Sequence, residues 1–108
     1  MEQTTFKAIC ELIAQRKVRV SAHAFARCSK RGILTTEVIF GAAVGSPIED
    51  YPDYHVGPAV LVLQYDGTNL PIHALWGLEK GTTEPAVLVT VYRPDRDEWT
   101  PDFRTRRR

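Results

Sequence analysis

The stretch AVLVLQYDGTNLPIHALWGL, residues 59–78, decides the fold, because it holds two short runs of strand-forming residues joined by turn residues. Asp66-Gly67 is a turn signal, and the apolar runs on either side of it predict two antiparallel strands. Runs of the same kind lie at IEDY (48–51) and AVLVTVY (86–92). We therefore expect a four-stranded antiparallel sheet. Its strand order stays open, because the second and fourth runs are too apolar to form an unprotected edge.

The first half of the chain has helical periodicity instead. Apolar residues three and four apart predict one helix over about residues 5–17. A second helix is expected between Ser21 as N-cap and Gly32 as left-handed C-cap, with Phe25 and Cys28 buried. A third is expected over about residues 35–45. Helices followed by strands predict an α+β domain in which about three N-terminal helices pack on a four-stranded antiparallel sheet.

The length of 108 residues and the hydrophobic content of 44% predict one domain, residues 1–103, followed by a basic tail, residues 104–108. The net charge is only +1, yet six cations between residues 16 and 31 have no acid among them. Such a surface suits an anionic partner such as RNA. We expect the arginines of the tail to be mobile, because nothing apolar follows Phe103, and to add affinity for that partner.

Cys10 and Cys28 lie within helical apolar patterns, and we expect reduced thiols rather than a disulfide. The N-terminal stretch resembles no export signal, and no run of about 20 apolar residues predicts a membrane span. These features predict a cytoplasmic protein. The three histidines and two cysteines lack zinc-type spacing, and no glycine-rich phosphate loop occurs, so we expect neither a metal nor another cofactor.

The second helix carries the first half of a candidate site. Four polar side chains, His23, Arg27, Lys30 and Arg31, cluster along one edge of it. The positive end of the helix dipole disfavours a charged imidazole at His23, which could then accept a proton. The planar guanidinium of Arg27 could hold a phosphate through two hydrogen bonds. Arg27, Lys30 and Arg31 could all contact RNA.

The strands supply the other half, since alternation can place His73 and Tyr92 on one face of the sheet. These groups suit metal-independent RNA cleavage. His23 would be the base, Arg27 the phosphate clamp and His73 the acid, with Tyr92 nearby, although the two histidines could exchange roles. The alternative is that the helix edge is a solvated surface, or a non-catalytic module that binds RNA or a protein.

Four segments together resemble the small bacterial family called domain of unknown function 4258. They are SAHAFARCSKRGI, VGSPIEDY, LPIHALWG and VLVTVYRPDRDEW. The family's helical motif falls on His23, Ala24, Arg27, Cys28, Arg31, Gly32 and Ile33, with cysteine in place of the usual methionine. Its strand residues fall on His73, Thr90, Val91, Tyr92 and Trp99.

The family is similar to the RelE-like toxin ribonucleases, and its members often lie beside a zinc-finger, antitoxin-like protein. The resemblance therefore implies a RelE-like fold, a ribonuclease of a toxin–antitoxin pair and an antitoxin-like protein as partner. It adds weight to the four positions that the residues alone single out as catalytic candidates.

Overall fold

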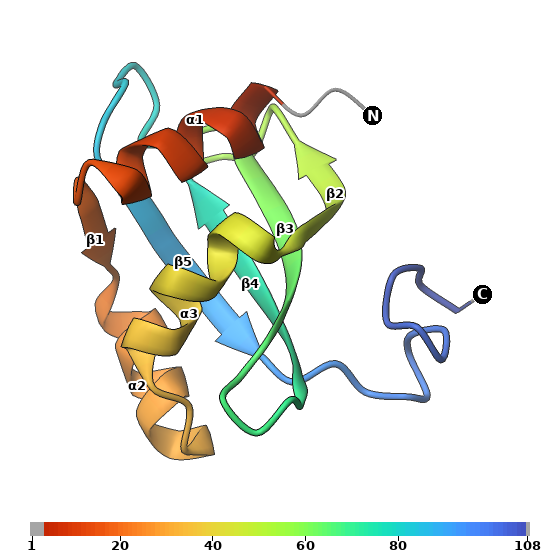
Figure 1. The fold of residues 1–108 in the computed structure, drawn as a ribbon. Helices are drawn as coiled ribbons and strands as arrows, with labels where there is room; N and C mark the ends of the chain where they lie inside the picture. Colours follow the sequence, from red (N-terminus) through yellow and green to blue (C-terminus); the bar gives the residue numbers. More distant parts are fainter. Residues whose placement is uncertain (1–3, 108) are drawn as a thin grey trace.

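The computed structural model describes residues 4–107, which form an α+β fold with three α-helices and one five-stranded mixed sheet. In chain order the elements are α1 (Thr4–Ala14), β1 (Val18–Val20), α2 (Ala22–Arg31), α3 (Thr35–Gly41), a 3₁₀ turn (Ala42–Val44), β2 (Ser46–Tyr51), β3 (Ala59–Tyr65), β4 (Pro71–Gly77) and β5 (Ala86–Tyr92). Figure 1 shows α1 and α3 lying across one face of the sheet.

The strand order is β1-β5-β4-β3-β2, in which β2 to β5 form an antiparallel meander and β1 runs parallel to β5. The prediction of four antiparallel strands is therefore wrong in number and in type. Three residues around Arg19 are too few to give a strand signal, so β1 was missed. Its position has a clear physical reason, because it covers the open edge of the apolar strand β5.

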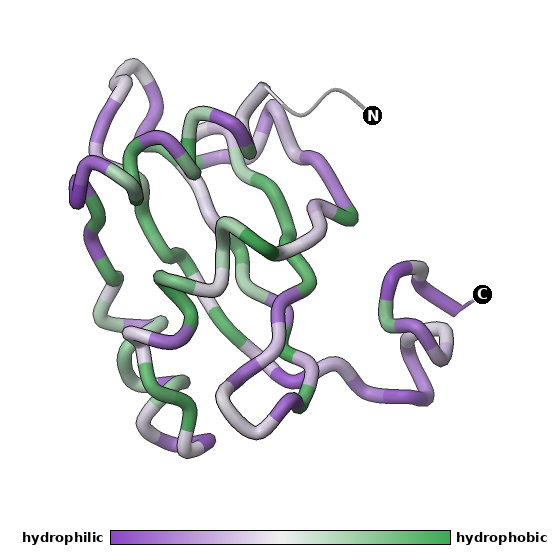
Figure 2. Tube along the Cα trace, in the orientation of Figure 1, coloured by the Kyte–Doolittle hydropathy of each residue, from purple (hydrophilic) through white to green (hydrophobic). Residues whose placement is uncertain are grey.

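The larger core lies between the helices and the sheet. Ile9 and Leu12 of α1, Cys28 of α2 and Val38 of α3 are buried in it together with Trp76 of β4. Figure 2 shows the matching hydrophobic colour along the central strands. Gln64 crosses this core as a polar bridge, since its side chain donates to the Val38 carbonyl and accepts from the Trp76 indole. The buried amide thus leaves neither partner unsatisfied.

Two helices are shorter than expected. α1 ends at Ala14 rather than near residue 17, because Arg16 adopts a left-handed backbone with φ of 61°. The α-helical part of α3 ends at Gly41, and the chain tightens to 3₁₀ geometry before Gly45. Neither end changes which face of the helix is buried.

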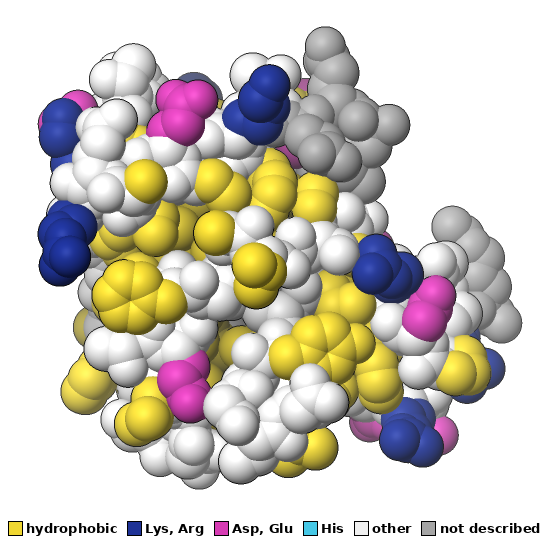
Figure 3. Space-filling view, in the orientation of Figure 1, with side chains coloured by type: hydrophobic (Ala, Val, Ile, Leu, Met, Phe, Trp, Pro, Cys, Tyr) yellow, Lys and Arg dark blue, Asp and Glu magenta, His cyan; other side chains and the backbone are white. Residues whose placement is uncertain are grey.

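The prediction that Phe25 is buried is wrong, whereas the prediction for Cys28 is confirmed. α2 buries only the narrow stripe of Ala24 and Cys28. Phe25, which follows Ala24 in the sequence and points to a different side of the helix, is 60% exposed. The helix faces a single strand, β5, too little sheet to cover a wider stripe. Leu34 and Phe40 are exposed too, and Figure 3 shows hydrophobic side chains reaching solvent on the helical side.

A bulge in the pairing of β4 with β5 sets the faces of the last strand. Leu75 pairs with Thr90 and Trp76 with Leu88, so Val89 is the extra residue. Leu88 points into the larger core, whereas Val89 packs in a smaller core on the other face of the sheet. Without the bulge, strict alternation would carry the next residues to the wrong face.

Candidate functional site

The start of α2 is fixed to β5 by the residues that cap it. The Ser21 hydroxyl accepts a hydrogen bond from the Ala24 amide at 3.0 Å and donates to the Val89 carbonyl at 2.9 Å. Gly32 ends the helix with φ of 66°, as predicted. Both caps therefore have the expected chemistry, and the N-cap also sets where the first turn lies against the sheet.

His23 lies in that first turn with its ring exposed. Its Nε2 is 3.0 Å from the Thr90 hydroxyl, which holds the imidazole against β5. Among the contacts of residues 4–107, Nδ1 has no protein partner. The exposed ring can therefore contact a molecule bound at this face.

The three cations of α2 follow His23 along the helix. Arg27 is half-buried one turn beyond it, and Lys30 and Arg31 are exposed. No ion pair within residues 4–107 engages any of the three. Their charges remain available to an external anion, as the charge pattern predicted.

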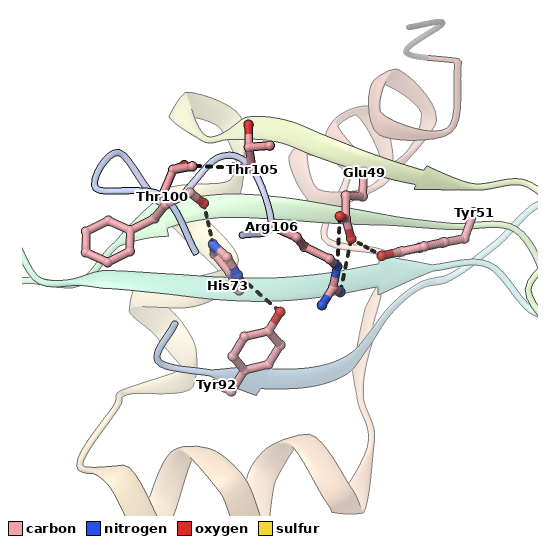
Figure 4. A network of polar contacts seen from close by, with 8 residues as sticks. Glu49, Tyr51, His73, Tyr92, Thr100, Thr105 and Arg106 are labelled. Atoms are coloured by element: carbon pink, nitrogen blue, oxygen red, sulfur yellow. Dashed lines mark hydrogen bonds and ion pairs between the residues drawn. The ribbon is translucent and has the colours of Figure 1, made fainter. Parts of the chain in front are cut away.

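His73 has a different environment from His23. It is fully buried, with Nε2 at 2.8 Å from the Phe103 carbonyl and Nδ1 at 3.1 Å from the Tyr92 hydroxyl. A carbonyl can only accept, so Nε2 carries the hydrogen and Nδ1 accepts from Tyr92. Burial lowers the pKa of His73 and raises that of Tyr92 to about 12. Both groups are thus held in their neutral forms, and Figure 4 shows the hydrogen bond between them.

Residues 99–106 close this side of the sheet. Trp99 is buried and packs edge-on against His73, with ring centroids 4.4 Å apart. Arg106 lies over the Trp99 ring, its guanidinium carbon 4.6 Å from the ring centroid, and its Nε binds Glu49 at 3.0 Å. Tyr51 donates to the same carboxylate. Figure 4 shows this network bridging β2, β4 and β5.

The expectation of a mobile tail does not match these contacts. Arg106 pairs with Glu49, and the Glu49 carboxylate raises the pKa of the Arg106 guanidinium. Arg104 donates to the Ser46 hydroxyl at 3.2 Å, and Arg107 to the Arg96 carbonyl at 2.8 Å. The basic tail was expected to lack anchors, but the buried Trp99 precedes it and holds it in place. Arg108 lies outside the described residues.

The structure thus pairs the predicted site residues differently from the hypothesis. His73 and Tyr92 are hydrogen-bonded partners, as their shared face predicted, whereas His23 binds Thr90. No hydrogen bond within residues 4–107 joins His23 to His73. Because both ring nitrogens of His73 are engaged and its ring is shielded from solvent, it cannot reach a substrate in this arrangement.

The sequence reasoning missed Glu49, Phe103 and Arg106, which enclose His73. A signal was present, since Trp99 and Phe103 are large apolar residues in an otherwise polar segment, which favours packing against the domain. No cluster of three metal-ligating side chains occurs in the described part of the chain. No helix among residues 4–107 has the length and apolar character that a bilayer crossing requires.

Comparison with known families matches residues 20–93 to the family described as domain of unknown function 4258. The match spans α2, which carries His23, and all four strands of the meander, which carry His73 and Tyr92. No curated protein and no solved structure matches the chain. The matched region is more than half of the chain, and the chain therefore belongs to the family of domain of unknown function 4258.

Proposed function

We propose that this protein is a metal-independent endoribonuclease of the toxin type, similar to the RelE-like toxins, and that RNA binds across the start of α2 and the end of β5. One observation carries the proposal. His23 is exposed yet held by Thr90 at 3.0 Å, with Arg27 one helical turn away and free of ion pairs within residues 4–107. An imidazole and an unpaired guanidinium are two of the groups that metal-independent phosphodiester transfer uses.

In the proposed reaction, His23 removes the proton from a 2′-hydroxyl as that oxygen bonds to phosphorus. The bond from phosphorus to the 5′-oxygen breaks, and the imidazolium of His23 returns the proton to this oxygen. The products are a 2′,3′-cyclic phosphate and a 5′-hydroxyl. Arg27 stabilises the charge on the five-coordinate phosphate, and Lys30 and Arg31 bind neighbouring phosphates.

His73 and Tyr92 have a supporting role in this proposal. His73 was expected to be the acid, which in this fold would require residues 99–106 to move away. With Nδ1 accepting from Tyr92 at 3.1 Å, His73 fixes the Tyr92 hydroxyl instead. We propose that the pair holds the end of β5, and so Thr90 and His23, in position. An antitoxin-like partner would act by covering α2, and RNA as substrate would place the activity in the cytoplasm.

The test is incubation of the purified protein with mixed RNA in excess chelator. Wild type should release fragments that end in a 2′,3′-cyclic phosphate, and His23→Ala should cut the rate by about 100-fold or more, the usual contribution of a general base. Arg27→Lys should also be slower, because lysine cannot form the two-pronged contact. Lys7→Ala, which removes an exposed cation from α1, is the matched control.

Absence of cleavage by the wild type, or equal cleavage by wild type and His23→Ala, would reject catalysis. One observation favours the second candidate, a non-catalytic RNA-binding module, because burial of His73 removes the group that was expected to act as the acid. Such a module would bind RNA without cutting it. Its binding would weaken with salt, and the slope of log affinity against log salt would fall by about one for each phosphate-contacting cation removed.

A further inference from the structure

A pocket of about 510 Å³ lies next to the proposed site and has no part in the chemistry described above. It opens beside the start of α2, where Ser21 and Val89 belong to its lining. Thr90 follows Val89 directly, and its hydroxyl holds His23. A molecule in the pocket would therefore contact β5 one residue before the position that holds His23.

The floor of the pocket is apolar and made of small side chains. Ala59, Gly77, Val87 and Val89 line it from β3, β4 and β5. A Cβ at Gly77 would lie 3.2 Å from the Pro58 carbonyl oxygen, which is tighter than ordinary contact, and 3.4 Å from the Ala59 Cβ. The absence of a side chain here keeps the floor low and flat, which suits a planar ligand.

One wall is aromatic and belongs to the loop between β2 and β3. The rings of Tyr54 and His55 are adjacent, with centroids 4.6 Å apart, and both line the pocket. The loop is tied to the end of β4 by hydrogen bonds from the Leu78 amide to the Pro58 carbonyl and from the Lys80 amide to the Val56 carbonyl. The wall is thus formed before any ligand binds, which reduces the entropy lost on binding.

The rim carries more positive than negative charge. Arg19 and Lys80 contribute two cations, and Glu79, which pairs with Arg19 at 2.6 Å, contributes the acid. Lys80 is exposed and takes no part in an ion pair within residues 4–107. A ligand with a flat apolar body and an anionic attachment matches this combination of floor, wall and rim.

We propose that this pocket is a subsite for one nucleobase of single-stranded RNA, whose phosphates cross the cationic rim toward His23. The assignment rests on the proposed function for its choice of RNA, and on the pocket's own chemistry for its choice of a base. Bases that are not paired stack readily on aromatic side chains, and the volume lies within the range of small-ligand sites. The base would enter between the aromatic wall and the flat floor, next to the scissile phosphate.

Binding, measured by calorimetry without any cleavage, tests the proposal. The ligands are the four 5′-mononucleotides, ribose 5-phosphate as the baseless control, and short 2′-O-methyl RNA, which lacks the attacking hydroxyl. At least one mononucleotide should bind ten times more tightly than ribose 5-phosphate, and the oligomer more tightly still. If the protein binds all four mononucleotides no more tightly than ribose 5-phosphate, the base assignment is overturned. If it binds the oligomer no more tightly than the mononucleotide, the assignment to RNA is overturned.

Two variants locate the binding. Val89→Phe fills the pocket and should weaken nucleotide binding at least tenfold, whereas Val44→Phe makes the same exchange at an exposed position outside the pocket and should leave it unchanged. His55→Ala removes part of the aromatic wall from an exposed loop residue, so folding is spared. It should weaken binding about 5- to 150-fold, the range for one stacked base. Wild-type affinity in both pocket variants would overturn the proposal.

The outcomes separate this proposal from the proposed function. His23→Ala should slow cleavage by about 100-fold or more and leave nucleotide binding intact, because His23 does not line the pocket. Nucleotide binding without any cleavage by the wild type would support the subsite and reject the ribonuclease. Cleavage by the wild type, with no preference in binding for a nucleotide over ribose 5-phosphate, would support the ribonuclease and reject the subsite.

Discussion

His73 should make the stability of the fold depend on pH just below neutrality. Burial lowers the pKa of His73 in the folded protein below its ordinary value, which the unfolded chain keeps at about 6.5. Below pH 6.5 the unfolded chain therefore binds a proton that the folded chain does not. The contribution of neutral His73 is fully present above about pH 6.5 and is lost as the pH falls from there toward the folded pKa.

The size of the effect follows from linkage. The free energy of unfolding should fall by up to about 1.4 kcal/mol per pH unit across that window, against a total of about 5–15 kcal/mol for a typical domain. Asp66 does not interfere. Its pKa is lowered chiefly by a hydrogen bond from the Leu70 amide, so its contribution is lost only below the ordinary carboxylate value of about 4.

Urea unfolding at steps between about pH 7.5 and pH 5 measures this slope. His73→Gln should flatten it, whatever its own stability, and His55→Gln, which changes an exposed histidine, should leave it as in the wild type. An NMR titration of the wild-type His73 ring measures the folded pKa directly. A midpoint at or above 6.5, or the same slope in His73→Gln and wild type, would refute the reasoning.

Two further changes test the packing around the site, both measured by urea unfolding. Trp99→Ala should cost about 3–5 kcal/mol because the ring is fully enclosed, whereas Phe25→Ala, at a residue 60% exposed, should stay within about 0.5 kcal/mol. A cost below about 1 kcal/mol at Trp99 would contradict the closed second core. Ser21→Ala should cost about 1 kcal/mol through the lost N-cap, against almost no change in Ser29→Ala on the exposed side of the same helix, and equal effects would argue against the cap.

Local chemistry made much of α2 and the meander predictable. The Ser21 side chain caps an amide three residues away, and Gly32 ends the helix through its own left-handed backbone. Both caps depend only on neighbouring residues and formed as expected. The β-runs were found because hydrophobic patterning is also local. His73 and Tyr92 share one face as predicted, but strict alternation would also put Leu88 on that face, and it is the bulge at Val89 that separates Leu88 from Tyr92.

The features that escaped prediction depend on contacts between distant parts of the chain. The parallel pairing of β1 with β5 joins residues 18–20 to residues 86–88, and three residues carry no periodicity. The enclosure of His73 depends on Phe103, thirty positions away. A histidine on a strand looks the same in sequence whether solvent or a returning segment covers it, so its accessibility could not be predicted.

The segment over His73 also has a consequence for how the protein is made. Residues 99–106 leave the ribosome after every strand of the sheet, although they cover its inner strands. If residues 99–106 close over the sheet last during folding, Leu75 and Tyr92 face water until they do. Exposed apolar strands of this kind are what chaperones bind and what aggregates in a nascent chain. A released chain truncated just before Trp99 would thus present a half-covered sheet to the quality-control machinery.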